Sequence, residues 1–308
     1  MAKKTKRRYR SIIILSIIFV ITLGINLFIY FQNEKLKSNY QNLETNYQDI
    51  LKEKEDKEKT YNELKEKLEL VNNIDTTIEE TKNDFFTKAK QLEDKILAGE
   101  TNAKIAYLTF DDGPYYLSYE FLKVLDEADV LATFFTIGNN KQVCYDKKDE
   151  NCYPLYALEA SKGHTMANHT FSHGIWYGLY DSPSNFMTQV KKQEQLLIEQ
   201  AGVKPNIVRF PGGSGTAKKH KNAIIELLRQ NGYGWVDWSA STGDGGSLTD
   251  YNVGWNNFTN SINSNIEVVL MHDYNKITLQ MLPNEIKYLR ENGYHIFPLF
   301  YESNMVNK

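Results

Sequence analysis

Two short motifs combine residue types that bind metals and move protons. Asp111 and Asp112 are adjacent carboxylates that open an Asp-Asp-Gly-Pro sequence. His169 and His173 are four residues apart in His-Thr-Phe-Ser-His, a step that would place both imidazoles on one face of a helical turn. Each motif also has an ordinary interpretation, a polar turn for the carboxylates and surface or capping histidines for the pair.

Taken together, the two motifs predict a catalytic metal centre. Imidazole nitrogens and a carboxylate oxygen suit zinc and its neighbours, and two histidines with one aspartate leave coordination positions for water and substrate. Zinc is therefore the default cofactor, although iron, cobalt and nickel ions use the same ligands.

At these motifs the sequence resembles the polysaccharide deacetylases, also called NodB homology or carbohydrate esterase family 4 proteins. Three later segments match further motifs of that family in the same order, namely Arg209-Phe210-Pro211-Gly212-Gly213, Asp237-Trp238 and Leu270-Met271-His272. The resemblance covers residues 105–300 and leaves the N-terminal third of the chain outside it.

The resemblance implies a role for each of the first-motif and second-motif residues. Asp112, His169 and His173 would hold the divalent metal ion, and Asp111 would act as the general base that deprotonates the attacking water.

The later motifs imply the acid and its helpers. His272 would protonate the leaving nitrogen, and Asp237 would hold that imidazole and favour its charged form. Arg209 would pair with Asp111, orient it and keep it ionised.

Three residues would contact the substrate. The resemblance places Trp238 and Leu270 around the acetyl methyl group, where plain core packing is the alternative. Many family members carry an aromatic residue after the proline of the third motif, whereas this chain has Gly212, whose main-chain N–H could still donate to an oxyanion.

The elements that must position these residues alternate between strand-like and helical patterns. Apolar strand-like runs are expected at residues 105–110, 132–137, 207–210, 234–238, 267–272 and 295–300, with helices at 119–128, 184–200, 219–231 and 281–292. Alternation of this kind predicts a parallel α/β fold with its chemistry at the carboxyl ends of the strands. We expect a distorted, incomplete (β/α) barrel of the NodB homology type, covering residues 104–302.

The N-terminal segment has the composition of a membrane anchor. Residues 11–31 carry no formal charge and are long enough to cross a bilayer as a helix, and residues 1–10 hold six basic side chains. The pattern predicts a single-pass cell-membrane protein with a cytoplasmic N-terminus and an extracytoplasmic catalytic domain; a cleaved signal peptide is the alternative. The net charge is −3 with this basic cluster included, so the globular part lacks the basic surface that nucleic-acid binding requires.

Residues 32–98 have the heptad spacing of a helical, coiled-coil-like stalk. Apolar or aromatic residues recur in steps of four and three from Leu36 to Val71, and the register continues through Phe85 to Ile96. Lys54 and Lys57 interrupt the seam, so a homodimer through the stalk and a single solvated helix are both open.

Cys144 and Cys152 are the only cysteines of the chain. Outside the membrane they can form a disulfide across a short polar loop, and two free thiols are the alternative.

These observations lead to one expected activity and two alternatives. We expect metal-dependent removal of N-acetyl groups from amino sugars of an extracytoplasmic polysaccharide, with peptidoglycan as the substrate. The alternatives are a deacetylase of another glycan (a chitin-like oligomer, an exopolysaccharide or acetylated xylan) and a catalytically silent glycan-binding protein on the same fold.

Overall fold

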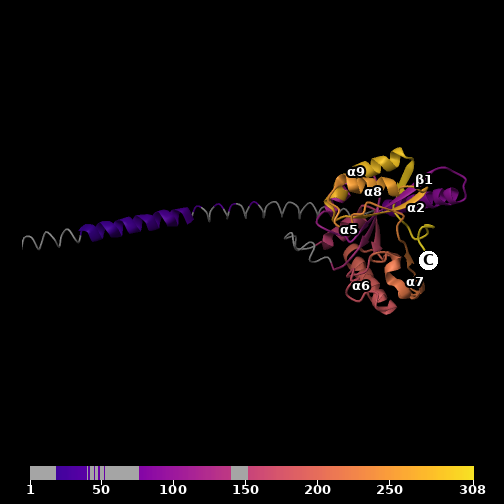
Figure 1. Ribbon diagram of the computed structural model, residues 1–308, viewed down its shortest axis with the longest axis horizontal. Coiled ribbons are helices and arrows are strands. Elements are labelled where there is room, and N and C mark those ends of the chain that lie inside the picture. The colour runs from indigo at the N-terminus through magenta and orange to yellow at the C-terminus, as the bar shows by residue number, and fades with distance from the viewer. Residues whose placement is uncertain are drawn as a thin grey trace, which may run out of the picture. The chain divides into compact units, whose positions relative to one another are not determined.

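The computed structural model describes residues 19–39, 41, 45, 48, 52, 76–139 and 152–308, and the chain divides into two units, Met1–Lys67 and Leu68–Lys308. In the first unit residues 19–39 form a helix (Figure 1). Within the described ranges no helix is both long and apolar enough to cross a membrane. Residues 11–18 of the expected anchor and most of the heptad seam lie outside the described residues, so the anchor, the stalk and its dimer stay predictions.

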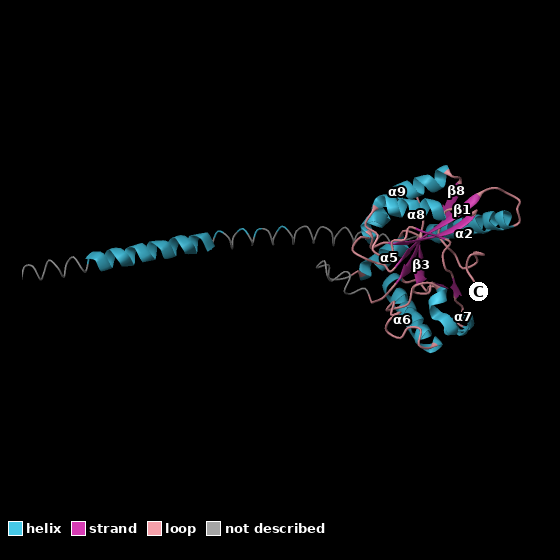
Figure 2. Cartoon of the chain, in the orientation of Figure 1, coloured by secondary structure: helices cyan, strands magenta, loops and turns pink. Residues whose placement is uncertain are grey.

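The second unit is built on a parallel sheet (Figure 2). Its described strands are β1 (Lys104–Asp111), β2 (Thr133–Thr136), β3 (Thr165–Asn168), β4 (Ile207–Val208), β5 (Gly234–Trp235), β6 (Ala240–Ser241), β7 (Ile266–His272) and β8 (Tyr294–Phe297). They are ordered β5-β4-β3-β2-β1-β7-β6, and β8 pairs with the first half of β1, whereas β2 pairs with its second half. This arrangement confirms the predicted parallel α/β class.

The sheet must curl because its two edge strands are neighbours in the sequence. Strands pair about 4.8 Å apart, so a flat path of this order would hold β5 and β6 about 29 Å from one another. The link from Trp235 to Ala240 spans at most about 18 Å even when fully extended. The sheet is therefore an open half-barrel, and Asn307 forms an antiparallel bridge with Trp235 on the β5 edge.

Helices surround the strands, with α8 and α9 on one side and α6 and α7 on the other (Figure 1). The described elements of this layer are α3 (Ser118–Glu127), α5 (Tyr153–Ser161), α6 (Pro183–Ala201), the 3-10 helix η1 (Ser214–His220), α7 (Lys221–Gln230), α8 (Tyr251–Ser261) and α9 (Lys276–Glu291). Side-chain caps fix the starts of three of them, at Ser182 before α6, Asp250 before α8 and Asn275 before α9.

Helix α2 (Thr76–Leu97) packs into the core of this unit, although its residues lie in the range 32–98 for which the heptad spacing predicts a stalk. Ala89 and Ile96 are buried in one cluster with strand residues such as Ile105 and Val268, and Phe86 stacks on Phe300 with ring centroids 5.3 Å apart. The heptad register continues into α2. The apolar face of α2, however, packs on the sheet of the same chain and not on a second helix. A heptad pattern alone does not distinguish these two partners.

A buried carboxylate on α2 forms hydrogen bonds with strand β1 and with the C-terminal segment. Glu93 is fully buried and accepts hydrogen bonds from the Tyr107 hydroxyl (3.1 Å), the Ser303 hydroxyl (2.7 Å) and the Asn304 N–H (2.8 Å). Three donors compensate the cost of burying the carboxylate, so α2 is attached in a single register.

Candidate active site

The sheet register brings Asp111, Arg209 and His272, together with Asn168, to one edge of the sheet. Asp111 is the last residue of β1 and lies level with His272, the last residue of β7. Asn168 ends β3, and Arg209 follows β4 directly. Because parallel strands point the same way, all four side chains lie at the carboxyl ends of the strands, where the chemistry of such folds occurs.

Asp112 begins the turn after β1 in a backbone conformation that non-glycine residues rarely adopt. Its φ is 72°, in the left-handed region. With this geometry both neighbouring carboxylates approach the same imidazole, since the His169 Nε2 atom is 3.5 Å from Asp111 Oδ2 and 3.6 Å from Asp112 Oδ1. Strain of this kind is characteristic of functional sites.

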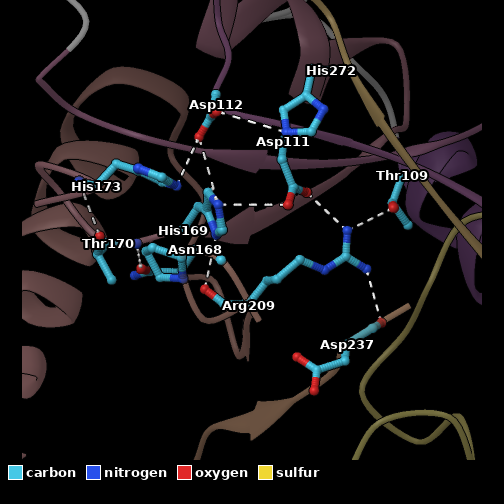
Figure 3. Close-up of polar contacts among 12 residues, drawn as sticks. Thr109, Asp111, Asp112, Asn168, His169, Thr170, His173, Arg209, Asp237 and His272 are labelled. Carbon is cyan, nitrogen blue, oxygen red and sulfur yellow. Dashed lines mark hydrogen bonds and ion pairs between the residues drawn. The ribbon is translucent and has the colours of Figure 1, made fainter. Parts of the chain in front are cut away.

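Asp112, His169 and His173 form a three-residue cluster with the geometry of a metal site (Figure 3). One ligand atom from each residue lies within 4.8 Å of the others, and Asp112 Oδ1 is 3.5 Å from His173 Nε2. Asp112 Oδ1 is buried and accepts no hydrogen bond from the described residues. A buried carboxylate oxygen flanked by two imidazole nitrogens fits a divalent cation, so the triad is consistent with a divalent metal site.

A backbone carbonyl sets the tautomer of His169. The His169 Nδ1 atom lies 2.9 Å from the Arg209 carbonyl oxygen, which only accepts, so Nδ1 carries the proton and Nε2 presents its lone pair to the cluster. Burial, followed by the nearby charge of His173, lowers the pKa of His169 to about 3. His169 is therefore a neutral imidazole, the form that binds metals.

The histidines meet through a turn, and the expected helical face is wrong. Residues 169–174 are not helical, and both Thr170 (φ 66°) and His173 (φ 48°) have left-handed backbones. Asn168 fixes this turn, because its Oδ1 accepts from the Thr170 N–H at 2.9 Å and its Nδ2 donates to the Val190 carbonyl oxygen at 2.9 Å. The imidazole ring centroids are 5.0 Å apart.

Asp111 and Arg209 form a buried ion pair. Arg209 Nη1 lies 2.8 Å from Asp111 Oδ1, and the same nitrogen donates to the Thr109 hydroxyl at 2.7 Å. Burial raises the pKa of Asp111, and the Arg209 charge opposes that rise. The guanidinium thus orients the carboxylate as predicted, while burial makes Asp111 a stronger base than an exposed aspartate.

The partner of His272 is Asp244, and the predicted pairing with Asp237 is wrong. Asp244 Oδ1 lies 2.8 Å from His272 Nδ1, and Asp244 Oδ2 accepts from the His272 N–H (2.8 Å) and the Thr278 hydroxyl (2.6 Å). The Asp237 carboxylate instead accepts from the Ser214 N–H (2.9 Å) and hydroxyl (2.6 Å). In Figure 3 it is turned away from His272, and its backbone carbonyl accepts from Arg209.

Asp244 also determines the charge state of His272. Burial lowers the pKa of His272, but the hydrogen bond and charge of Asp244, together with Asp112 and Asp111, outweigh it and raise that pKa to about 9. The imidazole is therefore protonated near neutral pH, as a proton donor must be. Its Nε2 atom, 3.8 Å from Asp112 Oδ2, is the one that faces the metal cluster.

The three predicted substrate contacts lie near the centre. Gly212 has a left-handed φ of 71°, and its N–H meets no acceptor among the described residues. Trp238 is 36 % exposed, with its ring centroid 5.9 Å from the Arg209 guanidinium carbon. Leu270 is buried two residues before His272 on β7, so both side chains point to the same face. Their proposed roles stay predictions.

Cys152, directly before α5, is disulfide-bonded. Its predicted partner, Cys144, lies outside the described residues, so the pairing itself stays a prediction.

Comparisons with known proteins identify the family to which this chain is similar. Residues 98–236 match the family model for polysaccharide deacetylase. A peptidoglycan-N-acetylglucosamine deacetylase from Bacillus cereus is 30% identical over 213 residues, which cover 65% of this chain and 71% of the relative. A chitin deacetylase from Pestalotiopsis sp is 30% identical over 179 residues, covering 58% of this chain and 56% of that protein.

Solved structures show the same architecture. The catalytic domain of a peptidoglycan N-acetylglucosamine deacetylase from Eubacterium rectale superposes with a TM-score of 0.59 at 29% identity, covering 67% of this chain and 93% of that one. A polysaccharide deacetylase from Bacillus cereus gives a TM-score of 0.56 at 28% identity, with coverages of 65% and 94%.

Proposed function

Since this chain belongs to the polysaccharide deacetylase family, and is thereby a carbohydrate deacetylase that hydrolyses amide bonds, we propose that its substrate is peptidoglycan. The observation that carries the activity is the cluster of Asp112, His169 and His173 beside the Asp111–Arg209 pair and the protonated His272. A relative named for peptidoglycan and one named for chitin are both 30% identical to this chain, so identity does not distinguish the two polymers. Peptidoglycan as the substrate is therefore the proposal, and measured activity on each polymer tests it.

The proposed mechanism divides proton transfer between two residues. Asp111, oriented by Arg209, accepts a proton from the water that attacks the acetyl carbonyl. The Gly212 N–H, which meets no acceptor among the described residues, would donate to the developing oxyanion. His272, protonated and held by Asp244, then gives its Nε2 proton to the sugar nitrogen as the amide bond breaks, so acetate and a free amine leave.

A divalent metal held by Asp112, His169 and His173 would supply positive charge that polarises the carbonyl and acidifies water. We propose zinc, because two imidazole nitrogens and one carboxylate oxygen are a donor set that would suit it. Elemental analysis of protein purified without added metal tests this choice, and a stoichiometric content of iron, cobalt or nickel would overturn it.

The test of the activity uses three polymers. Acetate release is measured on purified peptidoglycan, chitin oligomers and acetylated xylan, with mass spectrometry of the digested wall to locate the lost acetyl group. We expect the highest kcat/KM on peptidoglycan; a preference for chitin or xylan would replace the proposed substrate. Asp111→Asn should lower kcat by about 100- to 10,000-fold, the usual contribution of a general base, and unchanged release would contradict the assignment of Asp111.

We also propose that residues 11–31 anchor the protein in the cell membrane with the catalytic unit outside. The support is the uncharged run and the six basic residues before it. Carbonate-washed membranes from expressing cells should retain the full chain. A protein that lacks residues 1–31 should be absent from the washed membrane fraction. External protease should cleave the catalytic unit on intact protoplasts; protection from it would reverse the orientation.

Pairing of the stalk is a further part of the proposal. The seam from Leu36 to Val71 favours a homodimer, and Lys54 and Lys57 oppose it. Light scattering of the detergent-solubilised chain measures its mass directly. A monomeric mass across the working concentration range would contradict the homodimer and indicate that the stalk is a single unpaired helix.

A further inference from the structure

Two large rings stand almost fully in solvent beside the metal cluster. Trp176 is 89 % exposed and Tyr177 is 92 % exposed. Of the four tryptophans in the chain, the other three have ring or cation partners, for example Trp235 against Phe210 at 5.7 Å. Among the described residues, no ring or cation contact involves Trp176 or Tyr177. The two rings are adjacent in the sequence, and contiguous exposed aromatic surface of this kind marks binding sites.

The segment that carries these rings is firmly packed. Leu179 is 3 % exposed in the cluster around Phe186, and Tyr180 stacks on Phe186 at 5.7 Å. The Tyr180 hydroxyl donates to the Pro211 carbonyl oxygen at 2.8 Å. On the other side of the pair, Ile175 lies against Gly212, where an added Cβ would meet Ile175 Cδ1 at 3.2 Å. Because its neighbours pack inward, the segment presents both rings outward in a preorganised position.

The position of the rings connects them to the active site. Trp176 follows His173 by three residues, so it lies within about 11 Å of that metal-site residue along the backbone. A second aromatic group lies beside His272, where the Tyr274 ring is 5.1 Å from the imidazole and the Tyr115 ring is 5.9 Å from the Tyr274 ring. Figure 3 places His173 and His272 on opposite sides of Asp112, and Trp176 and Tyr177 follow His173 in the sequence.

We propose that Trp176 and Tyr177 form a platform that binds sugar rings flanking the reacting sugar, on the His173 side of the site. The apolar face of a sugar ring stacks on an aromatic ring, and an exposed platform suits a polymer that extends past the centre. This inference rests on the proposed deacetylation of a glycan. The segment from Gly174 to Asp181 holds no lysine or arginine, which disfavours a membrane-surface role for the same rings.

The test compares a short and a long substrate on the full chain. Acetate release is measured with the dimer and the hexamer of N-acetylglucosamine for the parent protein, Trp176→Ala and Tyr177→Ala. We expect the ratio of kcat/KM for the hexamer to that for the dimer to fall about tenfold in each variant, through KM, as for loss of an aromatic anchor at an interface. Trp176→Phe, which keeps a ring, should restore most of the ratio.

A matched control lies on the outer face of α6, away from the site. Ile198 is 40 % exposed, and Ile198→Ala should leave both substrates unaffected. Equal losses on the two oligomers, or no loss on either, would overturn the platform. Vesicles of phosphatidylglycerol that bind the parent protein but not Trp176→Ala, with an unchanged ratio, would assign the rings to a membrane instead.

The two hypotheses fail in different ways. If the parent protein with added zinc releases no acetate from any glycan, the proposed function fails, and calorimetric titration with the hexamer still tests the platform. Weaker hexamer binding by Trp176→Ala than by Ile198→Ala would then support it, whereas equal binding would reject it.

Discussion

At the scale of single residues, the two aspartates near Arg209 and His272 have separate tasks. The Asp237 carboxylate accepts two hydrogen bonds from Ser214, whereas the Asp244 carboxylate contacts the His272 imidazole directly. Asp244 stands in the sequence Ser241-Thr242-Gly243-Asp244, a second acidic position after the matched Asp237-Trp238 pair. The order of the residues in the sequence does not show whether Asp237 or Asp244 contacts His272 at the end of β7.

The distinction between these aspartates is open to a kinetic test. Asp244 keeps the pKa of His272 high, and the proton donor must be charged, so activity is lost as pH rises through that pKa. Asp244→Asn removes this support, and the alkaline limb of the kcat profile should move to lower pH. In Asp237→Asn the limb should stay within half a pH unit; a shift there and none for Asp244→Asn would restore the original pairing.

Asp273 should make stability depend on pH. Burial, only partly opposed by a hydrogen bond from Ser118, raises the pKa of Asp273 to about 7. The folded state therefore binds this proton more tightly than the unfolded state, whose aspartate titrates near 3.9. The contribution is fully present below about pH 4 and is lost as pH rises through 7, by at most about 1.4 kcal/mol per pH unit.

Urea unfolding of metal-loaded protein at pH 5 and pH 8 measures this effect. Asp273→Asn should narrow the difference in unfolding free energy between the two pH values, because an amide does not ionise. The exposed Glu199→Gln serves as a control and should retain the full difference. An unchanged difference in Asp273→Asn would show that other groups cause the pH dependence.

At the scale of elements, α2 is part of the catalytic unit. Its face of Ala89, Glu93 and Ile96 is buried against the strands and the C-terminal segment. The same steps of four and three serve a coiled coil and a helix docked on a sheet, so the pattern indicates an apolar face and not its partner. The part of α2 from Phe86 to Ile96 therefore belongs to the catalytic unit and not to a separate stalk.

Replacement of Glu93 tests the docking of α2. Glu93→Ala leaves the hydroxyls of Tyr107 and Ser303 and the Asn304 N–H without their acceptor in a buried site. We expect the unfolding free energy to fall by about 2–4 kcal/mol, measured by denaturant unfolding. The neighbouring Asp94 is solvent-exposed, and Asp94→Ala should have a much smaller effect. Equal effects would argue against a structural role for the buried carboxylate.

At the scale of the whole molecule, the metal cluster joins two distant parts of the chain. Asp112 comes from the turn after β1, whereas His169 and His173 come from the turn after β3. The unfolded chain does not hold these ligands together, so metal binding should stabilise the native state alone.

Thermal unfolding measures this linkage without reference to activity. The midpoint should rise when zinc is added to the chelator-treated protein and should continue to rise with zinc concentration above the dissociation constant. His173→Ala should shift the rise to much higher zinc concentrations. His220, outside the cluster, supplies the control variant His220→Ala, which should respond like the parent protein. A zinc response that survives in His173→Ala would place the ion elsewhere.

Sequence determined most of the chemistry, because chemical identity and spacing are local properties. Asp111, Asp112, His169, His173 and His272 were all named from motifs, and the alternation of strand and helix indicated that they lie at one edge of a parallel sheet. The sequence pattern does not predict strand β3, because Thr165–Asn168 is only four residues long and shows no alternation of apolar and polar residues.

Tertiary structure decided which groups meet. The partner of His272, the turn that joins the two histidines and the docking of α2 all depend on contacts between segments far apart in the chain. Each carboxylate or apolar face had more than one acceptable partner in the sequence, and only the packing of the sheet and its helices leaves a single partner within hydrogen-bonding distance. The motifs thus predict the catalytic groups, and the fold decides which residues contact them.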